Sequence, residues 1–494
     1  MIEAMIQGFG SIFEPRVFLF MMIGVVVAII FGIIPGLGGM TYLALMIPLT
    51  YAMEPVQALA FLLAGHAVVH TSGGITSILI NVPGTGQSAA TLLDGFPMAQ
   101  QGKAGRAVGN AVGSSAVGGV FGAIVLVLTL PVLRQVVLAF TSAELFLLCI
   151  LGITFIAVLG TGAMIKGLIS GAMGIVLSLV GSDMVTGTSR LAWGNPYLND
   201  GLNIVPIVLG LFAVPEAFNL MATGKTIARP GSMATPGADL IEGVKDVFRH
   251  WSLVLRCSAI GTFIGALPGI GGEVAVWVCY GYAKQRSKHP EKFGHGSVEG
   301  VLAPEAADNS KEGGALIPTL GFGLPGSAGM AVMLGAFIIV GLVPGPAFLK
   351  EHLDIGFALV GVLVLSNLIA AIICLTMTKY LAKITIVPTR ILAPIIMGVI
   401  VLGAFASDSE MADVLALLIF GAMGYAMVRF GFSRPALILG FILGHLAEIY
   451  LHQSLMTMGP FFFTRPLSLI LVAIIIFALI SEPVRSMRKK RKTS

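Results

Sequence analysis

Charged residues are scarce in this chain. Asp, Glu, Lys and Arg make up 11% of its 494 residues, whereas a soluble globular domain carries roughly 25%. Hydrophobic residues make up 56%, and stretches such as Val17–Ile34 and Ile355–Thr378 contain no charge. Each such stretch is long enough to cross a hydrocarbon core. The composition excludes a soluble domain, and the continuous apolar runs exclude a β-barrel. The fold class we predict is therefore an all-α polytopic membrane protein.

The chain also lacks the common signatures of enzymes and of redox proteins. Its four cysteines show no CxxC spacing, so we expect them to be buried and reduced. No HExxH motif, nucleophile motif or phosphate-binding loop occurs, and Gly36–Gly39 lacks the strand–helix setting of a dinucleotide site. No basic region precedes the first apolar stretch, so we expect no cleavable signal peptide. We predict neither an enzyme nor a cofactor.

One short glycine-rich pattern is present twice. Pro35–Gly39 reads PGLGG and Pro268–Gly272 reads PGIGG, offset by 233 positions. Each copy is followed by a second turn, Pro83-Gly84 and then Pro325-Gly326, offset by 242 positions. Landmarks in the same order at nearly constant offset indicate an internal duplication. Proline removes a backbone donor and glycine frees the dihedral angles, so these turns predict breaks in membrane helices.

The duplication predicts two structural repeats, which we expect to be inverted. We assign residues 1–222 to the first repeat, with a re-entrant hairpin near 75–93, and residues 251–482 to the second, with a hairpin near 305–343. A hydrophilic linker, 223–250, separates them. Residues 483–494 form a basic tail, which the positive-inside rule places in the cytoplasm. A membrane-flanking anchor explains this tail, so we predict no nucleic-acid binding.

Broken helices in corresponding positions of two halves point to the binding site of a transporter. A helix that begins inside the membrane directs unpaired N–H groups and a positive dipole end at its surroundings, which favours an anion such as a carboxylate. Ordinary helix kinks are the other interpretation of the Pro-Gly pairs. The candidate substrate-binding residues are Asn81, Pro83, Gly84, Thr85, Ser88, Gly323, Pro325, Gly326 and Ser327.

A second group of residues can hold a coupling ion, because unwound carbonyls can coordinate Na⁺ and membrane-embedded charges are functional candidates. We expect Glu305, Asp308 and Asn309 at the mouth of the second hairpin. Asp94 is either a helix cap on an exposed loop or a site residue, and Glu144 and Glu216 are interfacial, paired or functional. The candidates for the coupling ion are Gly36, Gly38, Gly269, Gly271, Glu305, Asp308 and Asn309.

Two histidines, His66 and His70, are four residues apart and so share one face of a helix. They can form a metal pair, but two imidazoles without a third ligand more often form a packed, hydrogen-bonded pair. We therefore predict no metal site. Two alternative functions stay open: an intramembrane metal enzyme that uses this pair, and an ion or solute channel. No repeated ring of charges supports a channel.

Further motifs accompany the Pro-Gly turns in the same order along the chain. In the first part these are Gly32–Gly39, Ile80–Gly84, Leu93–Ala99 and Gly102–Gly105, and in the second Gly265–Gly272, Gly300–Ala307, Gly323–Gly326 and Gly341–Pro346. Together they resemble the large membrane subunit (TctA) of the tripartite tricarboxylate transporters, strongly over most of residues 20–350. Two positions depart from that family, Asp308-Asn309 in place of Asn-Asn and Ser72 in place of Tyr.

The resemblance implies a secondary transporter of the bacterial inner membrane with a cytoplasmic C-terminus. Such a protein imports a di-, tri- or aromatic carboxylate, driven by a Na⁺ or H⁺ gradient and without ATP. It also implies two partners, a small four-span membrane subunit (TctB-like) and a periplasmic solute-binding protein (TctC-like). The two departures put the particular substrate and ion in question.

Overall fold

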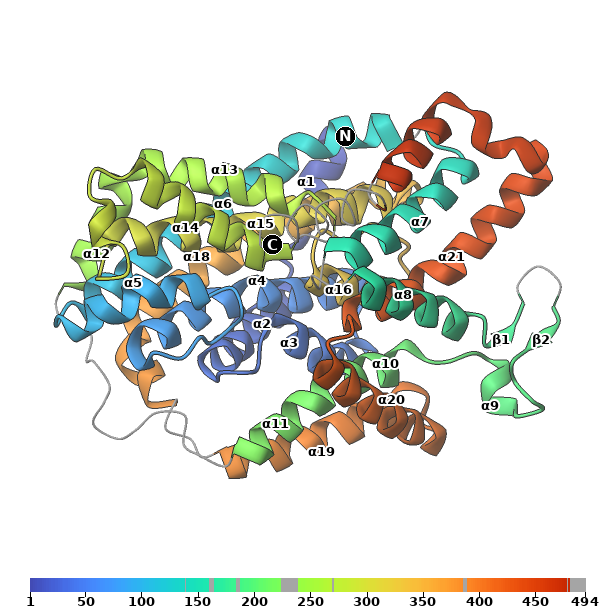
Figure 1. The fold of residues 1–494 in the computed structure, drawn as a ribbon, viewed down its shortest axis with the longest axis horizontal. Coiled ribbons are helices and arrows are strands. Elements are labelled where there is room, and N and C mark those ends of the chain that lie inside the picture. Colours follow the sequence, from blue (N-terminus) through green and yellow to red (C-terminus); the bar gives the residue numbers. More distant parts are fainter. Residues whose placement is uncertain are drawn as a thin grey trace, which may run out of the picture.

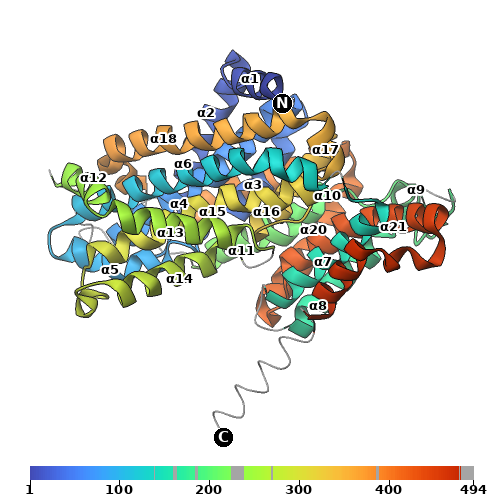
Figure 2. The same ribbon diagram turned by 90° about the horizontal axis from the view of Figure 1, so that it is seen from above.

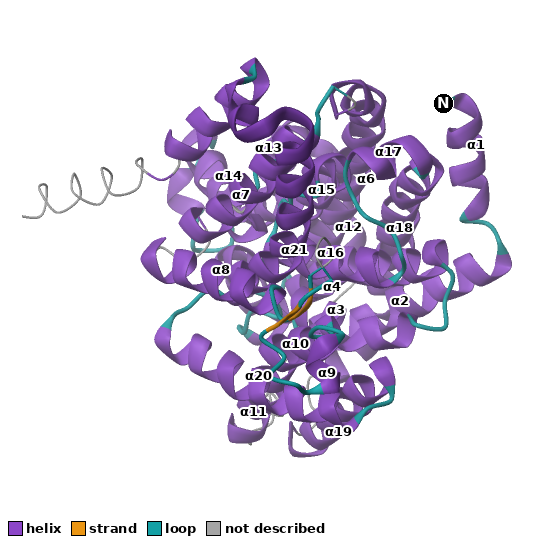
Figure 3. Ribbon diagram, turned by 90° about the vertical axis from the view of Figure 1, so that its right-hand side faces the viewer, coloured by secondary structure: helices purple, strands orange, loops and turns teal. Residues whose placement is uncertain are grey.

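Helices make up most of the described chain, which also contains one short antiparallel pair of strands (Figure 3). The computed structural model describes residues 1–137, 139–159, 164–183, 187–223, 239–268, 271–384, 389–477 and 479. Up to residue 223 the elements are α1 (Ile2–Ser11), α2 (Pro15–Ile33), α3 (Gly39–Met46), η1 (Ile47–Thr50), α4 (Pro55–Ile80), α5 (Ala89–Gln100), α6 (Ala104–Val137), α7 (Ser142–Leu159), α8 (Met164–Ser178), β1 (Gly181–Ser182), β2 (Ser189–Arg190), α9 (Pro196–Asn199), α10 (Ile204–Val208), the π-helical turn η2 (Leu209–Ala213) and α11 (Val214–Thr223).

The remaining elements follow the hydrophilic stretch. They are α12 (Leu240–Arg249), α13 (Trp251–Gly265), α14 (Gly271–Arg286), η3 (Pro290–Lys292), α15 (Val298–Phe322), α16 (Ala328–Ile339), α17 (Pro346–Glu351), α18 (Leu353–Ile384), α19 (Thr389–Asp408), α20 (Met411–Phe430), α21 (Arg434–Met458) and η4 (Gly459–Thr464). A last apolar helix covers Pro466–Phe477.

Seven helices among the described residues are long and apolar enough to cross a membrane. They are Pro15–Ile33, Pro55–Ile80, Ala104–Val137, Ile204–Ala222, Leu353–Leu381, Met411–Phe430 and Arg434–Thr464. Figures 1 and 2 show one group of long helices around α4, α6, α13, α15 and α18, and a second group that contains α7, α8 and α21. The prediction of an all-α polytopic membrane protein is confirmed.

The first predicted break is confirmed. Helix α2 ends at Ile33, and Gly36 has φ +92°, a value that glycine adopts without strain. Helix α3 then begins at Gly39. At the second break α13 ends at Gly265 and α14 begins at Gly271, but Gly269 and Ile270 lie outside the described residues.

The Pro-Gly tips join two pairs of helices. Helix α4 ends at Asn81, which has φ +56°, and α5 follows after Ser88. Helix α15 ends at Gly323, which has φ +67°, and α16 follows after Ser327. Helices α4 and α15 are unbroken up to these residues, so the first arm of each predicted hairpin is the end of a long helix. The inverted relation of the repeats, and a re-entrant course of the hairpins, stay predictions.

Both tips contain a glycine against which other backbone lies closely. A Cβ on Gly84 would clash with the carbonyl oxygen of Gly32, and one on Gly326 would clash with that of Gly265. Gly32 and Gly265 lie in the last turn of α2 and of α13, so each tip packs against the helix that precedes a glycine-rich break. The tips and the breaks are therefore adjacent in space, although about 50 residues separate them in sequence.

Helix α15 is enclosed by other helices despite its polar sequence. It contacts α4, α5, α6, α13, α14, α16 and α18. Asp308, Asn309 and Lys311 are each 1% exposed, and Glu305 and Glu312 are fully buried. The expectation that Glu305, Asp308 and Asn309 lie at the mouth of a hairpin is wrong, because α15 carries all three in the middle of an unbroken helix.

Small residues allow α6 to approach α15 closely. A Cβ on Gly118 would clash with the carbonyl oxygen of Ala306, and one on Gly122 with that of Ser310. We therefore expect Gly122→Ala to lower the melting temperature of the purified protein by several degrees, since overpacking of this kind costs about 1–3 kcal/mol. Gly281→Ala is the matched control, because nothing lies within 4 Å of its Cβ. Equal melting temperatures for the two variants would contradict the close contact.

Asp94 is buried and hydrogen-bonded rather than exposed on a loop. Its Oδ1 accepts hydrogen bonds from the backbone N–H groups of Gly294, Gly296 and Ser297, at 2.8–2.9 Å. Its Oδ2 accepts one from the hydroxyl of Tyr280, at 2.9 Å. The expected exposed cap is therefore wrong, and Asp94 instead connects α5 to the loop before α15.

Glu144 is paired, as one of the sequence interpretations expected. Its carboxylate accepts hydrogen bonds from Thr141 and from Ser468, and it forms an ion pair with Arg465 at 3.0 Å. These contacts connect the start of α7 to the last helix of the described chain. They give Glu144 a structural role.

Candidate functional site

A cavity of about 580 Å³ lies where both glycine-rich breaks and both Pro-Gly tips meet. Its lining comprises Gly36, Gly38, Gly39, Met40, Thr41, His66, His70, Pro83, Gly84, Thr85, Gly86, Gln87, Glu216, Gly272, Glu273, Ser327, Ala328, Gly329, Val428, Phe432, Ser433, Arg434 and Pro435. The cavity is thus built from segments of both halves of the chain.

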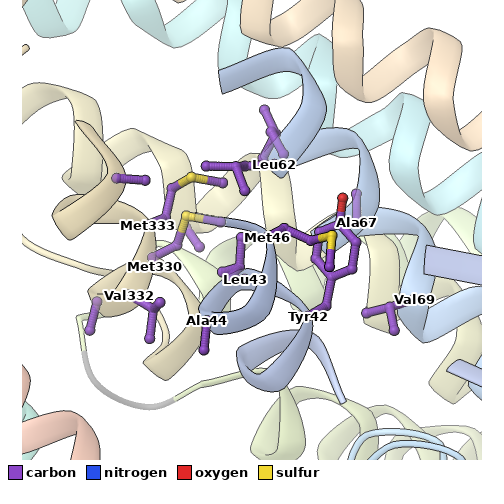
Figure 4. Close-up of a cluster of buried hydrophobic side chains, with 14 of the residues drawn as sticks. Tyr42, Leu43, Ala44, Met46, Leu62, Ala67, Val69, Met330, Val332 and Met333 are labelled. Carbon is purple, nitrogen blue, oxygen red and sulfur yellow. The ribbon is translucent and has the colours of Figure 1, made fainter. Parts of the chain in front are cut away.

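Helix α3 is held between α4 and α16 by apolar side chains (Figure 4). Tyr42 and Leu43 of α3 are fully buried, as are Leu62 of α4 and Met330 of α16. The hydroxyl of Tyr42 donates a hydrogen bond to the carbonyl oxygen of Phe61, at 3.0 Å. This packing fixes the first residues of α3 and of α16, both of which face the cavity.

The N-termini of four helices line the cavity: those of α3, α14, α16 and α21. The first N–H groups of a helix have no intrahelical partner, and the helix dipole adds positive potential there. The loop before α5 contributes a fifth segment, Pro83–Gln87. Convergent helix N-termini favour an anionic ligand.

Hydroxyl side chains hold the two tips in place. Ser88 Oγ accepts a hydrogen bond from the N–H of Thr85, and Thr85 Oγ1 accepts one from the N–H of Ser88. Ser327 is the N-cap of α16, where its Oγ accepts a hydrogen bond from the N–H of Met330 at 3.2 Å. Thr85 and Ser327 line the cavity, whereas Ser88 lies behind Thr85 and is fully buried.

Arg434 is the cationic side chain in the lining. Its Nη1 donates a hydrogen bond to the carbonyl oxygen of Leu211 at 3.0 Å, and its guanidinium lies 5.1 Å from the ring centre of Phe212. Its Nη2 is 3.9 Å from a carboxylate oxygen of Glu216. Leu211 and Phe212 belong to the π-helical turn η2, a distortion that is frequent at functional sites. A guanidinium held in this way can bind a carboxylate through its remaining N–H groups.

The structure brings six of the predicted site residues to the cavity and leaves others away from its lining. Gly36 and Gly38 of the first break and Pro83, Gly84, Thr85 and Ser327 of the tips line it. The residues outside the lining are Asn81, Ser88, Gly323, Pro325, Gly326, Glu305, Asp308 and Asn309. Gly271 is the first residue of α14. Asn81 and Gly323 are instead the left-handed C-caps of α4 and α15. Gly269 lies outside the described residues.

The buried polar residues of α15 lie behind the cavity wall. Thr91 and Ser115 donate hydrogen bonds to the carboxylate of Glu305, at 2.7 and 3.3 Å. Asn309 donates hydrogen bonds to Thr71, at 2.8 Å, and to Asn367. These bonds connect α15 to α4, α5, α6 and α18. The two departures of the chain from the family pattern, at Ser72 and Asp308, are both buried in this region.

His66 and His70 lie in the cavity wall with a third polar side chain beside them. The Nε2 atoms of both imidazoles lie 3.6 Å from Oε1 of Glu312, which belongs to α15. Within the described part of the chain, neither ring nitrogen of either histidine has a hydrogen-bond partner. The two rings pack edge to face with their centres 5.4 Å apart, so the expected packing of the pair is confirmed, whereas the expected hydrogen bonding is wrong for the described residues. Sequence reasoning missed Glu312 as a neighbour of the histidines because more than 240 positions separate it from them in the sequence.

Sequence reasoning also missed Arg434. The residue stands in Ser433-Arg434-Pro435, a helix start with proline in its first turn, and the available signal was a pair of arginines, Arg429 and Arg434, between two apolar stretches. The resemblance over this part of the chain rested on hydropathy and length alone. The position of Arg434 in the cavity wall therefore becomes visible only in the folded structure.

Comparison with known proteins assigns the chain to a family. Residues 18–439 match the Tripartite tricarboxylate transporter TctA family. The chain is 32% identical over 497 aligned positions to "Uncharacterized 52.8 kDa protein in TAR-I ttuC' 3'region" of Agrobacterium vitis, across 98% of this chain and 96% of that protein. It is 32% identical over 234 positions to "Uncharacterized protein in TAR-II ttuC' 3'region" of the same organism, across 47% of this chain and 97% of that protein. No solved structure matches.

The family match covers both glycine-rich breaks, both tips and Arg434, and the longer relative extends over almost the whole chain. With its apolar helices, this identifies a multi-pass membrane protein of a transporter family. The chain belongs to the Tripartite tricarboxylate transporter TctA family, whose members are the large membrane subunits of secondary transporters.

Proposed function

We propose that this chain imports an organic carboxylate through the cavity between its two halves. The observation that carries the proposal is the position of Arg434 in a wall formed by convergent helix N-termini. An arginine fork and unpaired helical N–H groups are the groups that proteins use to bind carboxylates. The substrate is a di-, tri- or aromatic carboxylate. Its carboxylate binds between Arg434, Ser327 and the tip Pro83–Thr85.

The transport cycle we propose is alternating access driven by a Na⁺ or H⁺ gradient. Both tips border the cavity, so a movement of the tips relative to α21 would change the side from which the cavity is open. Backbone carbonyls near the first break and the buried polar residues of α15 are the candidate sites for the coupling ion. Those residues are Gly36, Gly38, Glu305, Asp308 and Asn309.

The family also supports a proposal about partners and location. We propose that the chain works in the bacterial inner membrane with a small four-span subunit and a periplasmic solute-binding protein, and that its C-terminus is cytoplasmic. The binding protein would deliver the carboxylate to the cavity. The transporter family accords with transport rather than catalysis as the activity.

The proposal predicts uptake that depends on a gradient and on a binding protein. The chain and its small subunit are placed in liposomes and supplied with radiolabelled di-, tri- and aromatic carboxylates, under a Na⁺ or an H⁺ gradient, with and without the binding protein. We expect uptake of one class of carboxylate at least ten times above empty liposomes, only when both the gradient and the binding protein are present.

Two outcomes contradict this proposal. Carboxylate flux that ignores the gradient and the binding protein would indicate a channel. The absence of flux for every carboxylate, with all components folded and inserted, would remove the support for a carboxylate site. Uptake under one gradient alone identifies the coupling ion.

A further inference from the structure

We propose that His66, His70 and Glu312 bind a divalent transition-metal ion beside the carboxylate cavity. The three side chains each offer one ligand atom, and these atoms all lie within 4.8 Å of one another. The distance from each Nε2 to Oε1 of Glu312 is 3.6 Å. Ligand atoms of a tetrahedral site with bonds of about 2.1 Å are separated by about 3.4 Å, so the two distances to Glu312 already suit a bound ion.

The histidine side chains are buried without the partners that buried imidazoles require. Their exposures are 3% and 4%, and among the described residues no hydrogen bond reaches any of the four ring nitrogens. Oε2 of Glu312 also lacks a partner in the described chain. Burying polar atoms in this state is costly, and a bound metal ion removes the cost by accepting their lone pairs.

The charge around the site matches a divalent ion. Glu305, Asp308 and Glu312 share one face of α15 because they are three and four residues apart. With Lys311, the four side chains carry two net negative charges when the carboxyl groups are ionised. Lys311 donates a hydrogen bond to Oε1 of Glu312, and outer-shell bonds of this kind orient a ligating carboxylate. One divalent ion neutralises the cluster.

Two glycines make room for the imidazoles at the cavity wall. A Cβ on Gly39 would lie 2.6 Å from Nδ1 of His66 and 3.2 Å from Nε2 of His70. A Cβ on Gly329, in the first turn of α16, would clash with the ring of His66. The glycine-rich break and the second tip are therefore shaped around the histidine pair as well as around the cavity.

The ligand set selects the kind of metal and leaves a position open. Two imidazoles and one carboxylate suit Zn²⁺, Co²⁺ or a similar transition metal, whereas Mg²⁺ and Ca²⁺ prefer oxygen ligands. Three protein ligands leave at least one coordination position free. Since His66 and His70 line the cavity, that position faces it, and a carboxylate in the cavity can occupy it. This last step rests on the proposed function, whereas metal binding does not.

The test is a titration of the purified full-length protein with Co²⁺ after removal of metal by a chelator. We expect one tightly bound Co²⁺ per chain, with the visible absorption bands of a low-coordinate site. His66→Asn, His70→Gln and Glu312→Gln should each weaken binding at least tenfold. His445→Gln is the control, because His445 lies on α21 outside the cavity lining and should leave binding unchanged.

Azide then tests for the open position, since it adds to a metal ion only where coordination is incomplete. A shift of the Co²⁺ bands with azide supports the proposal, and an unchanged spectrum overturns the open position. Absence of stoichiometric Co²⁺ binding, or equal binding by all the variants, overturns the metal site and indicates that the cluster is neutralised by protons instead. Uptake plays no part in this readout, so failure of carboxylate transport and failure of metal binding are distinguishable.

Discussion

Replacing Arg434 with glutamine is expected to abolish carboxylate uptake in the reconstituted system. The guanidinium is held by Leu211 and Phe212 at the cavity wall, so it is positioned before a substrate arrives. The charge pair that is lost is the one between the guanidinium and the carboxylate of the substrate. Removing one partner of such a pair costs about 2–4 kcal/mol, which corresponds to roughly 30- to 1,000-fold in affinity for the substrate. Arg434→Lys should retain part of the activity, because lysine keeps the charge but loses the planar fork.

The matched control for this change is Arg190→Gln. Arg190 lies on β2 and forms a bidentate pair with Glu448 of α21. Neither residue belongs to the cavity lining. Uptake by this variant should be close to that of the parent protein. The melting temperature of Arg434→Gln, measured alongside, shows whether lost uptake reflects lost binding or lost folding. Full uptake by a folded Arg434→Gln variant would refute the role of this side chain.

Replacing Asp94 with alanine is expected to prevent the protein from folding stably. The buried carboxylate of Asp94 satisfies three backbone N–H groups and the hydroxyl of Tyr280, and two of these donors, Ser297 and Tyr280, are themselves buried. Alanine leaves these donors without a partner, and each unsatisfied buried group costs about 1–3 kcal/mol. For the two buried donors the loss is about 2–6 kcal/mol, a large part of the stability of a typical domain. The measurement is the yield and melting temperature of monodisperse protein in size-exclusion chromatography.

Two further variants test whether the lost hydrogen bonds cause the lower stability of Asp94→Ala. Asp94→Asn keeps one acceptor oxygen and should fall between the parent and Asp94→Ala in stability. Asp200→Asn is the control, because Asp200 is exposed and its replacement should change the melting temperature little. An Asp94→Ala protein as stable as the parent would show that the loop before α15 does not depend on this carboxylate.

The glycine-rich breaks and tips were predictable because their physical cause is local. Proline removes a donor and glycine permits a positive φ, so Pro35-Gly36 interrupts a helix wherever it stands in a membrane span. The duplicated order of these turns also pointed to a binding site at the broken helices, with the tips assigned to the substrate and the breaks to the coupling ion. The cavity lining confirms their proximity for Gly36, Pro83 and Ser327.

Polar residues within α15 were misread because their burial is a property of the tertiary structure. A sequence that contains Glu305, Asp308, Lys311 and Glu312 within eight positions has the composition of a loop. The helix is stable in the interior because Thr91, Ser115 and Asn367 on other helices provide its hydrogen bonds. The same applies to the contact of Arg434 with Leu211 and to that of Glu312 with His66, each of which joins residues more than 200 positions apart in sequence.

The enclosed position of α15 has a consequence for how this protein enters the membrane. The insertion machinery presents helices to lipid one after another, and an Asp or Lys at the centre of a helix costs about 2.5–3.5 kcal/mol in that step. Asp308 and Lys311, together with two buried glutamates, make α15 too costly to insert alone. Helices α4 and α6 are synthesised earlier and carry the partners of Glu305 and Asn309. We therefore expect α15 to enter the membrane only together with the earlier helices that carry these hydrogen-bond partners.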